Sequence, residues 1–268
     1  MDDKSYIRGL LNQCPRKYSD RTRTSGLSRN RPMQPTTLFY GVPSGCSFGS
    51  IVALEWLGQP YRLARIEMPE MVASDGYRRI NPVAETPSLL TEDGQVISES
   101  IAILNHVGAR GIDLGIGFAQ GTAQFDRLNQ MLGFLNTTFF NAFVPLWHIL
   151  EHGSDDNEAA VLREFGRAKV VRAHALLEAI LGDQPWLLGE QRTLADAYFI
   201  GIARWTRYHD VIDRRDYPNL QRLYDKLEAD PAVIFAHAIE RQQPAVTAAG
   251  FLGEVGMNDA LEWLPQAA

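Results

Sequence analysis

The sequence predicts an α/β unit followed by an all-helical unit. Between residues 36 and 112, short runs rich in β-branched and aromatic residues alternate with helix-like stretches, which is the pattern of an α/β fold. From residue 122 to residue 242, apolar residues recur at helical spacing and strand-like runs vanish. The chain has 268 residues, of which 45% are hydrophobic, so it can bury the cores of two modest domains.

The α/β unit is expected to run strand, helix, strand, irregular helix, hairpin and helix. After the first strand, residues 48–57 carry the apolar face of a helix, which Gly58 ends and Pro60 keeps from continuing. A second strand is expected at residues 61–66. Further on, the Asp-Gly pair within residues 92–94 lies between two strand-like runs and predicts a hairpin. The last helix of the unit follows this hairpin.

The helical unit is expected to begin after a linker at residues 113–121, which is rich in glycine. Apolar side chains at residues 125–135 form a stripe with a period of about 3.6 residues. They predict a long helix that reaches Trp147, with Pro145 bending it, because proline disrupts the interior of a helix. A second helix is expected at residues 161–179.

The rest of the helical unit contains a local signal for a helix start. Thr193 and Asp196 have the spacing of a capping box, in which each side chain bonds to the backbone N–H of the other residue. We assign both residues a structural role. Shorter helices are expected at residues 218–228 and 231–242, and residues 243–268 are expected to form a C-terminal tail.

The composition excludes several classes of protein. The net charge is −6, but residues 1–35 alone carry +5, which leaves −11 for the remainder and argues against a nucleic-acid-binding body. We interpret residues 1–35 as a basic, polar N-terminal extension without its own core. No run of eighteen apolar residues indicates a membrane span, and the first residues lack the apolar stretch of a secretion signal. The expected location is therefore cytoplasmic.

The two cysteines, Cys14 and Cys46, are too few for a disulfide framework, and we expect no bound metal. Cys46 lies where a strand-like run gives way to a helix. The N–H groups and dipole of a helix start favour a thiolate, so the pKa of the Cys46 thiol is expected to fall. A dithiol cycle within this motif is excluded, because Cys46-Ser47-Phe48-Gly49 lacks a second cysteine. Ser44 and Ser47 lie in the same turn.

Two further motifs follow the turn. One is Glu85-Thr86-Pro87-Ser88-Leu89, and the other is Ser98-Glu99-Ser100 at the expected start of the last helix of the α/β unit. A third, Leu188-Gly189-Glu190, leads into the capping box. With these landmarks in this order, residues 36–242 resemble a cytosolic glutathione S-transferase. The resemblance implies a thioredoxin-like N-terminal domain followed by the all-helical C-terminal domain of that family.

The resemblance also implies a ligand and its contacts. The co-substrate is expected to be glutathione. Pro87 is expected to be cis, and the backbone of Thr86 to pair with the cysteinyl part of glutathione. Ser100 is expected to take the γ-glutamyl carboxylate at a helix N-terminus, where N–H groups favour an anion, and Glu99 to take the ammonium group.

The class within the family stays open. The turn is similar to the Ala-Cys-Ser junction of beta-class enzymes, in which Cys46 would form a mixed disulfide with glutathione. It is also similar to the Ser-Ser-Cys-Ser junction of zeta-class enzymes, in which Ser44 would stabilise the thiolate. The His-Lys pair of the beta class is missing from the segment Phe140-Asn141-Ala142-Phe143-Val144-Pro145-Leu146, and Gly49-Ser50-Ile51 replaces the arginine-rich continuation of the zeta class. We therefore rank Cys46 first as the catalytic residue, followed by Ser44 and Ser47.

The expected activity is transfer of glutathione, whose thiolate acts as nucleophile or reductant on a small apolar electrophile in detoxification. Phe140, Phe143 and Trp147 are the candidates for the electrophile pocket. The resemblance implies a homodimer. The alternatives are a non-catalytic binding or interaction protein with the same fold, and a specialised glutathione-dependent isomerase, lyase or dehalogenase.

Overall fold

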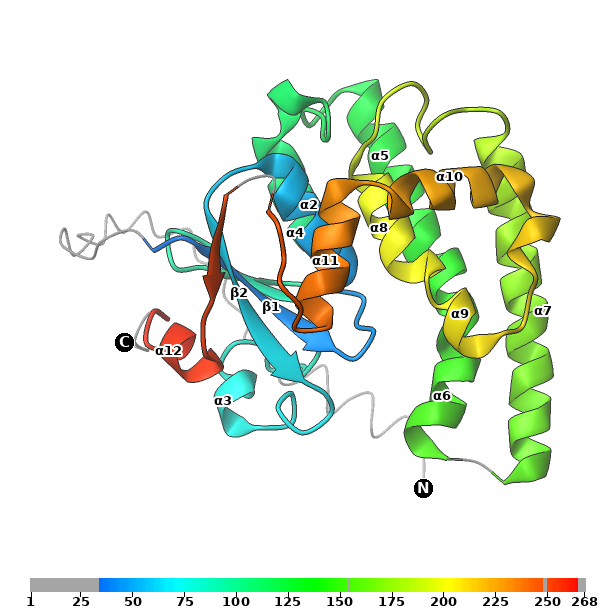
Figure 1. Ribbon diagram of the computed structural model, residues 1–268, viewed down its shortest axis with the longest axis horizontal. Helices are drawn as coiled ribbons and strands as arrows, with labels where there is room; N and C mark the ends of the chain where they lie inside the picture. Colours follow the sequence, from blue (N-terminus) through cyan, green and yellow to red (C-terminus); the bar gives the residue numbers. More distant parts are fainter. Residues whose placement is uncertain (1–33, 154, 248–249, 265–268) are drawn as a thin grey trace, which may run out of the picture. The chain divides into compact units, whose positions relative to one another are not determined.

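The computed structural model describes residues 34–153, 155–247 and 250–264 of the chain. The predicted N-terminal extension therefore lies outside the described residues, apart from Gln34 and Pro35. The described residues form a mixed sheet with helices on both faces, beside a bundle of helices (Figure 1). This arrangement confirms the predicted fold class.

The sheet has five strands in the order β4-β3-β1-β2-β5. The two central strands β1 and β2 are parallel, β3 and β4 run antiparallel to their neighbours, and β5 is parallel to β2. The bounds are Thr36–Val42 for β1, Tyr61–Glu67 for β2, Ser88–Leu90 for β3, Val96–Ser98 for β4 and Phe251–Glu254 for β5.

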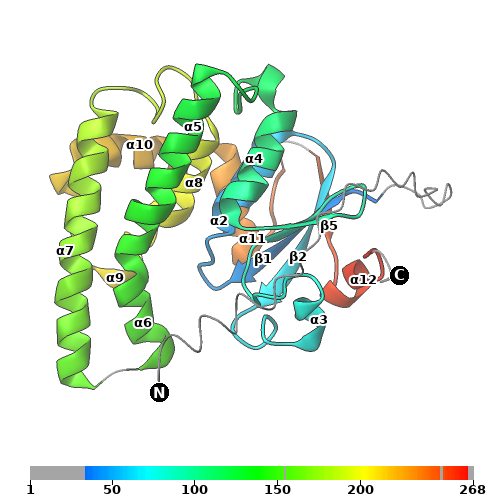
Figure 2. The same cartoon turned by 180° about the vertical axis from the view of Figure 1, so that it is seen from behind.

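The two faces of the sheet bury different sets of side chains. Alternate residues of a strand point to opposite faces, so Leu38 and Tyr40 of β1 pack into the main core, while Phe39 packs into a smaller one. The main core lies against α2 (Phe48–Leu57) and α4 (Ser100–Arg110). The smaller core lies against α3 (Asp75–Arg78) and α12 (Met257–Leu261), which Figure 2 shows on the opposite side of the sheet.

The C-terminal segment returns to the first domain. β5 pairs with β2 at the edge of the sheet, and Tyr61 donates its backbone N–H to the carbonyl of Gly250 at 2.9 Å. Leu261 of α12 is buried in the smaller core. Residues 251–264, which lie within the predicted C-terminal tail, therefore complete the α/β unit.

The bundle contains seven α-helices within the described residues. They are α5 (Ala123–Phe134), α6 (Val144–His152), α7 (Asp156–Leu181), α8 (Leu194–Ala203), α9 (Thr206–His209), α10 (Pro218–Glu228) and α11 (Pro231–Glu240), with short 3₁₀ turns at η1 (Ile112–Leu114), η3 (Asn141–Phe143) and η4 (Arg214–Asp216). Within the described ranges, no helix combines the length and the hydropathy that a membrane span requires.

The predicted long helix is interrupted before Pro145 rather than bent at it. A π-helical segment, η2 (Leu135–Phe140), and the 3₁₀ turn η3 separate α5 from α6. Pro145 lies in the first turn of α6, where its missing N–H leaves no hydrogen bond unmade. The proline therefore begins a helix here, and the prediction that it bends one was wrong.

Close packing of α2 against α8 joins the two domains. A Cβ atom on Gly49 would lie 2.5 Å from the carbonyl oxygen of Ala197, and one on Gly201 would lie 2.9 Å from the backbone nitrogen of Gly49. The capping box predicted at the start of α8 is present. Burial raises the pKa of the Asp196 carboxyl to about 6, although Asp196 accepts backbone N–H groups of Leu187 and Thr193.

Candidate functional site

Three of the predicted site residues meet at the turn between β1 and α2. The thiol of Cys46 donates a hydrogen bond to the backbone carbonyl of Thr86 at 3.3 Å, and the hydroxyl of Ser100 donates to the Cys46 sulfur at 3.7 Å. The three residues come from the β1–α2 turn, the loop before β3 and the first turn of α4. The fold thus brings together positions that are 40 and 54 residues apart in sequence.

The surroundings of Cys46 raise the pKa of its thiol instead of lowering it. Desolvation by burial is the largest cause, while the hydrogen bond from Ser100 and the positive charge of Arg204 act in the opposite direction. The expectation of a lowered pKa was therefore wrong, because removing the thiolate from water outweighs the helix start. The Cys46 thiol is neutral near neutral pH.

Hydrogen bonds from Tyr77 and Asn81 hold the loop before β3. The peptide bond between Thr86 and Pro87 is cis, as the resemblance implies, and both residues are buried. The carbonyl of Glu85 accepts hydrogen bonds from the Tyr77 hydroxyl at 2.9 Å and from the Asn81 amide at 2.8 Å. These contacts hold the Thr86 backbone in place beside the thiol.

Glu99 and Ser100 lie at the start of α4. Glu99 has a φ of 72° and an exposed side chain, whereas Ser100 is buried. A left-handed conformation is unfavourable for a residue with a Cβ atom, and such residues are concentrated at functional sites. Partial burial and the charges of Glu151 and Glu99 raise the pKa of the Glu85 carboxyl, so these carboxylates form an acidic cluster near the turn.

The hydroxyls of the two serines of the turn take no part in the contacts among Cys46, Thr86 and Ser100. Ser47 is fully buried at the N-terminus of α2, and its hydroxyl accepts the backbone N–H of Gly41 at 3.0 Å. Ser44 has a φ of 56°, and its buried hydroxyl finds no hydrogen-bond partner among the described residues. Neither hydroxyl bonds to Thr86 or Ser100. We therefore assign Ser47 a structural role and treat Ser44 separately from the thiol.

The three aromatic candidates for the electrophile pocket have different environments. Phe143 is fully buried and belongs to the main core, and its place in an electrophile pocket stays a prediction. Phe140 and Trp147 are partly buried, and each packs its ring edge against Trp205, with centroids 5.1 and 5.3 Å apart. The indole N–H of Trp205 donates to the carbonyl of Ser44 at 2.9 Å, which connects this aromatic cluster to the turn.

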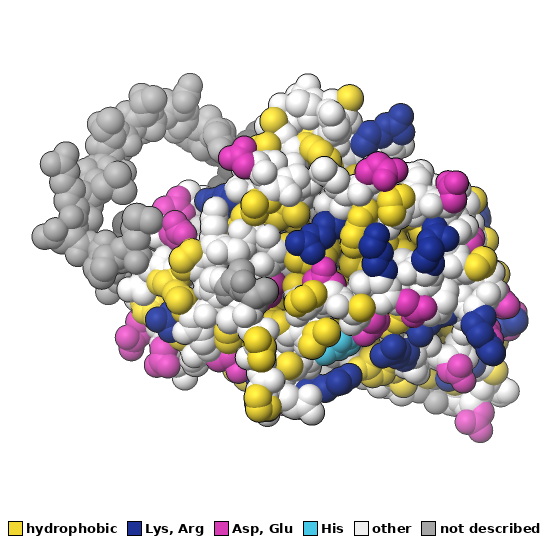
Figure 3. Space-filling model, turned by 45° about the horizontal axis from the view of Figure 1, so that its top comes forward, with side chains coloured by type: hydrophobic (Ala, Val, Ile, Leu, Met, Phe, Trp, Pro, Cys, Tyr) yellow, Lys and Arg dark blue, Asp and Glu magenta, His cyan; other side chains and the backbone are white. Residues whose placement is uncertain are grey.

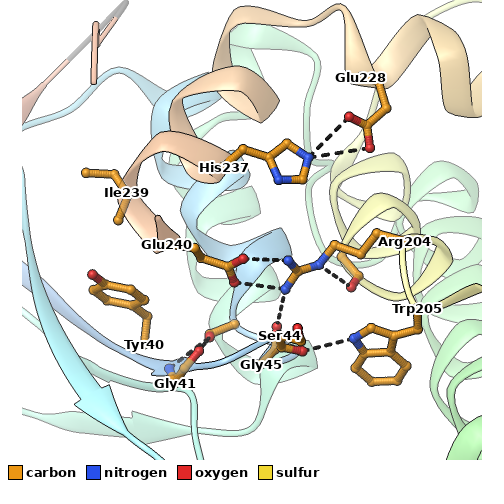
Figure 4. A network of polar contacts seen from close by, with 12 residues as sticks. Tyr40, Gly41, Ser44, Gly45, Arg204, Trp205, Glu228, His237, Ile239 and Glu240 are labelled. Carbon is orange, nitrogen blue, oxygen red and sulfur yellow. Dashed lines mark hydrogen bonds and ion pairs between the residues drawn. The ribbon is translucent and has the colours of Figure 1, made fainter. Parts of the chain in front are cut away.

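Arg204 was not predicted, yet it links the helical domain to the turn (Figure 4). Its guanidinium donates to the carbonyl of Gly45 at 2.9 Å and to the two oxygens of Glu240 at 2.5 and 2.8 Å. It also lies over the ring of Phe48 at 4.1 Å. Arg204 and Gly45 are 159 residues apart. No local motif marks this pair, so sequence reasoning had no signal from which to find it.

Tyr198 is a second residue that the sequence did not single out. Its hydroxyl donates to the Asn136 side chain in η2 at 2.8 Å. Burial raises the pKa of the Tyr198 hydroxyl, and the charges of Cys46 and Glu99 add to the effect. π-Helical turns occur often at functional sites, and this one places Asn136 beside the domain junction.

Two family models match the chain. The model described as "Glutathione S-transferase, N-terminal domain" matches residues 43–110, and the model described as "Glutathione S-transferase, C-terminal domain" matches residues 142–231. Together the two matches cover more than half of the sequence. The chain belongs to the glutathione S-transferase family.

Several known proteins are similar to this chain over most of their own length. Glutathione S-transferase GST-4.5 of Xanthomonas campestris pv. campestris is 28% identical over 195 residues, which cover 72% of this chain and 94% of that protein. Maleylacetoacetate isomerase of Pseudomonas aeruginosa is 25% identical over 216 residues, covering 77% and 96%. The solved structure of a sphingomonad glutathione S-transferase complexed with glutathione is 26% identical, with a TM-score of 0.68, and covers 76% of this chain and 98% of that one.

The groups around Cys46 decide which kind of ligand this region suits. Among the described residues, no group of three or more His, Cys, Asp or Glu side chains is placed to hold a metal ion. The Cys46 region instead offers a thiol, a hydroxyl, a buried backbone segment and a helix start. These groups suit a small peptide with a thiol and a carboxylate.

Proposed function

We propose that this chain binds glutathione beside Cys46 and joins it, through its sulfur, to a small electrophile. The observation that carries the proposal is the meeting of Cys46, Thr86 and Ser100, with the Cys46 sulfur 3.3 Å from the Thr86 carbonyl and 3.7 Å from the Ser100 hydroxyl. Membership of the glutathione S-transferase family supports it, as does the similarity to a sphingomonad enzyme that was solved with glutathione.

Each end of glutathione has a proposed partner. The backbone of Thr86, which precedes the cis bond to Pro87, pairs with the cysteinyl residue. Ser100 and the free N–H groups at the start of α4 bind the γ-glutamyl carboxylate, because a helix N-terminus favours an anion. The exposed carboxylate of Glu99 binds the ammonium group, and the acidic cluster with Glu85 adds to this attraction.

In the proposed reaction, the nucleophile is the sulfur of glutathione. The raised pKa of Cys46 keeps its S–H group protonated; when glutathione binds, this group turns from the Thr86 carbonyl and donates to the glutathione thiolate, which it stabilises. The thiol proton of glutathione leaves to solvent. The thiolate then forms a C–S bond with the electrophilic carbon, and the leaving group departs with the electron pair of the bond that breaks.

Thiol exchange is the second candidate activity, favoured by the partial exposure of Cys46. In this reaction the Cys46 thiolate attacks one sulfur of oxidised glutathione. The new S–S bond is a mixed disulfide, and reduced glutathione leaves with the electron pair of the former disulfide. The raised pKa of Cys46 makes exchange slow near neutral pH and faster in alkaline solution.

The location and assembly of the protein are also proposals. We place it in the cytoplasm, as a homodimer that conjugates electrophiles in detoxification, on the basis of its family membership. The match to a maleylacetoacetate isomerase keeps a glutathione-dependent isomerase as the alternative chemistry for the same site. Light scattering behind a sizing column measures the assembly, and a monomer at micromolar concentration would contradict the dimer.

Binding and turnover are tested separately. The full-length protein is expected to be retained on glutathione resin, and Glu99→Ala is expected to lose this retention. Glu92→Ala, which removes a carboxylate from the hairpin, is the matched control and is expected to be retained. Failure of the wild type to bind would overturn the glutathione site and favour the interaction protein.

Conjugation of chloro-dinitrobenzene is then measured for the wild type, Cys46→Ala and Ser44→Ala. We expect Cys46→Ala to be the most impaired, because it removes the donor to the thiolate. Intact mass after incubation with oxidised glutathione reports the mixed disulfide in the same proteins. Full activity of Cys46→Ala together with an unchanged wild-type mass would exclude the thiol role. Retention on the resin without turnover of any electrophile would support the non-catalytic alternative.

A further inference from the structure

We propose that the C-terminal end of α6 carries a two-histidine site for a divalent transition-metal cation such as Zn²⁺. His148 and His152 are four residues apart on this helix. Their imidazole rings are stacked, with centroids 4.5 Å apart and an angle of 20° between the ring planes. Histidines at positions i and i+4 lie on one face of a helix, where both can bind the same zinc ion. We call them the α6 histidine pair.

Both imidazoles of the α6 histidine pair are accessible and uncommitted. The side chains of His148 and His152 are exposed. Neither ring makes a hydrogen bond or an ion pair with any residue that the structure describes. The ring nitrogen of a neutral imidazole is the commonest protein ligand for metals. Within the described part of the chain, no polar contact has to break before a cation binds.

The separation of the two rings suits chelation after a small tilt. Zn–N bonds are about 2.0–2.1 Å long, so two nitrogens at a tetrahedral angle lie about 3.3 Å apart. The ring centroids of the pair are 4.5 Å apart, which is somewhat more. A tilt that brings one edge of each ring together closes the difference. Exposed side chains make such changes rapidly, so the helix itself does not have to move.

The position on the helix favours a cation. α6 ends at His152, and Gly153 follows with a φ of 67°. The last carbonyl groups of a helix have no partner within it and form the negative end of the helix dipole, which attracts positive charge. Three exposed acidic residues, Glu151, Asp155 and Asp156, lie within four residues of His152. The sequence from residue 144 to residue 156 contains no Lys or Arg.

The ligands decide the class of metal. Imidazole nitrogen suits Zn²⁺, Ni²⁺ and Cu²⁺, whereas Mg²⁺ and Ca²⁺ prefer oxygen ligands. Among the described residues, no third His, Cys, Asp or Glu side chain completes a group of three that could hold a metal ion. The pair therefore supplies two ligands and leaves the other positions to water or a small ligand. This site goes beyond the sequence, from which no bound metal is expected.

The other histidines of the chain are not placed to form a second pair of this kind. His174 and His209 are buried. His237 contacts the carboxylate of Glu228, and the Nε2 atom of His106 is buried. On the face of the molecule that Figure 3 shows, His surface is confined to a small area in the lower part, among scattered Lys, Arg, Asp and Glu side chains. A cation that prefers imidazole is therefore directed to the α6 histidine pair.

The site shares no ligand with the proposed glutathione site, although charge connects the two regions. Partial burial and then the charge of Glu151 raise the pKa of the Glu85 carboxyl, so the end of α6 and the loop before Thr86 influence each other electrostatically. None of the proposed contacts of glutathione belongs to the pair. The existence of the metal site therefore does not depend on the proposed function, and it is tested without glutathione.

The test titrates Zn²⁺ into the full-length protein by isothermal titration calorimetry, after a chelator has removed any bound metal. We expect Zn²⁺ to bind and Mg²⁺ to bind much more weakly, because imidazole is the ligand. Absence of Zn²⁺ binding at millimolar concentration overturns the site. Binding of Mg²⁺ as tightly as Zn²⁺ also overturns it, because the cation would then lie on carboxylates.

Variants of the pair locate the zinc. His148→Ala and His152→Ala are each expected to weaken Zn²⁺ binding by about tenfold or more, because the second imidazole acts at high effective concentration on a cation held by the first. Both side chains are exposed and alanine favours a helix, so these variants are expected to fold. His106→Ala is the matched control and is expected to bind like the wild type, because its Nε2 atom is buried. Unchanged affinity in both variants of the pair would overturn the proposal.

Thiol ligands are tested in the same way, because cysteine also binds zinc. The double variant Cys14→Ser/Cys46→Ser is titrated alone and with His148→Ala added. Zn²⁺ binding that persists without the thiols and weakens when His148 is replaced supports the pair. Loss of binding in the double variant alone would place the zinc at the thiols and contradict the proposal. Circular dichroism confirms that each variant is folded, so that a weaker affinity reports a lost ligand.

Discussion

Arg204→Met is expected to destabilise the protein more than any other single change at the turn. The guanidinium is 5% exposed and its partner carboxylate on Glu240 is 11% exposed. Methionine keeps much of the unbranched stem that packs in this region, so the change removes charge and hydrogen bonds more than it removes volume. It leaves the Glu240 carboxylate without its partner, and the carbonyl of Gly45 keeps only the longer hydrogen bond from the Phe48 N–H at 3.4 Å.

The size of the effect follows from this geometry. Breaking a buried ion pair by removing one partner costs about 3–5 kcal/mol, because an uncompensated buried charge remains. For a domain of this size, each kcal/mol lowers the melting temperature by about 2–4 °C, so the expected decrease is about 6–20 °C. The double variant Arg204→Met/Glu240→Met leaves no buried charge, and we expect it to be more stable than Arg204→Met alone.

The assay is urea unfolding followed by circular dichroism, with thermal unfolding as a second measurement. Arg215→Met is the control, because its ion pair with Asp213 is exposed and contributes little. The reasoning would be refuted if Arg204→Met matched the wild type to within about 1 kcal/mol, the range of an exposed pair. It would also be refuted if the double variant were less stable than Arg204→Met.

Three further predictions concern individual residues. In a Cys14→Ser background, alkylation of Cys46 by iodoacetamide is expected to be slow at neutral pH and to rise only in alkaline solution, because burial raises the pKa of Cys46; fast alkylation at pH values near neutral would contradict this. Gly49→Ala is expected to lower the unfolding free energy by about 1–3 kcal/mol, because a Cβ there meets the backbone of α8 at 2.5 Å. Gly133→Ala is expected to raise the unfolding free energy by about 0.5–1 kcal/mol, because a Cβ there meets no other atom and alanine favours the helix α5. If Gly49→Ala and Gly133→Ala both raised or both lowered the unfolding free energy, the packing argument would be contradicted. Ser47→Ala is expected to lower the unfolding free energy by about 1–3 kcal/mol, because it leaves the backbone N–H of Gly41 in β1 unpaired. The variant is expected to be retained on glutathione resin. Loss of retention by a folded variant would show that Ser47 takes part in binding glutathione.

Local signals in the sequence were sufficient for several elements. The capping box of Thr193 and Asp196 depends on groups three residues apart, and it is present at the start of α8. The Asp-Gly pair at residues 93–94 connects β3 and β4, as predicted. These features could be predicted because the interacting groups are neighbours in the chain.

Other features depend on segments that are distant from one another in the sequence. β5 is a strand of four residues that acquires its pairing only from β2, almost 200 residues earlier in the sequence. Phe143 is an aromatic residue of a kind that can line a pocket, and the π-helical and 3₁₀ turns before α6 place it in the main core. The spacing of the apolar residues in the sequence could not show that these two turns change the direction of the side chains.

The sequence by itself determined the two-domain fold, its family resemblance and the three segments that supply Cys46, Thr86 and Ser100. The tertiary structure alone decided how these groups act. It raised the pKa of the Cys46 thiol, because desolvation in the assembled site outweighs the local effect of the helix start. It also placed Arg204 against the carbonyl of Gly45 and buried the hydroxyl of Ser44 without a partner among the described residues, since burial and ion pairing depend on residues that only folding brings together.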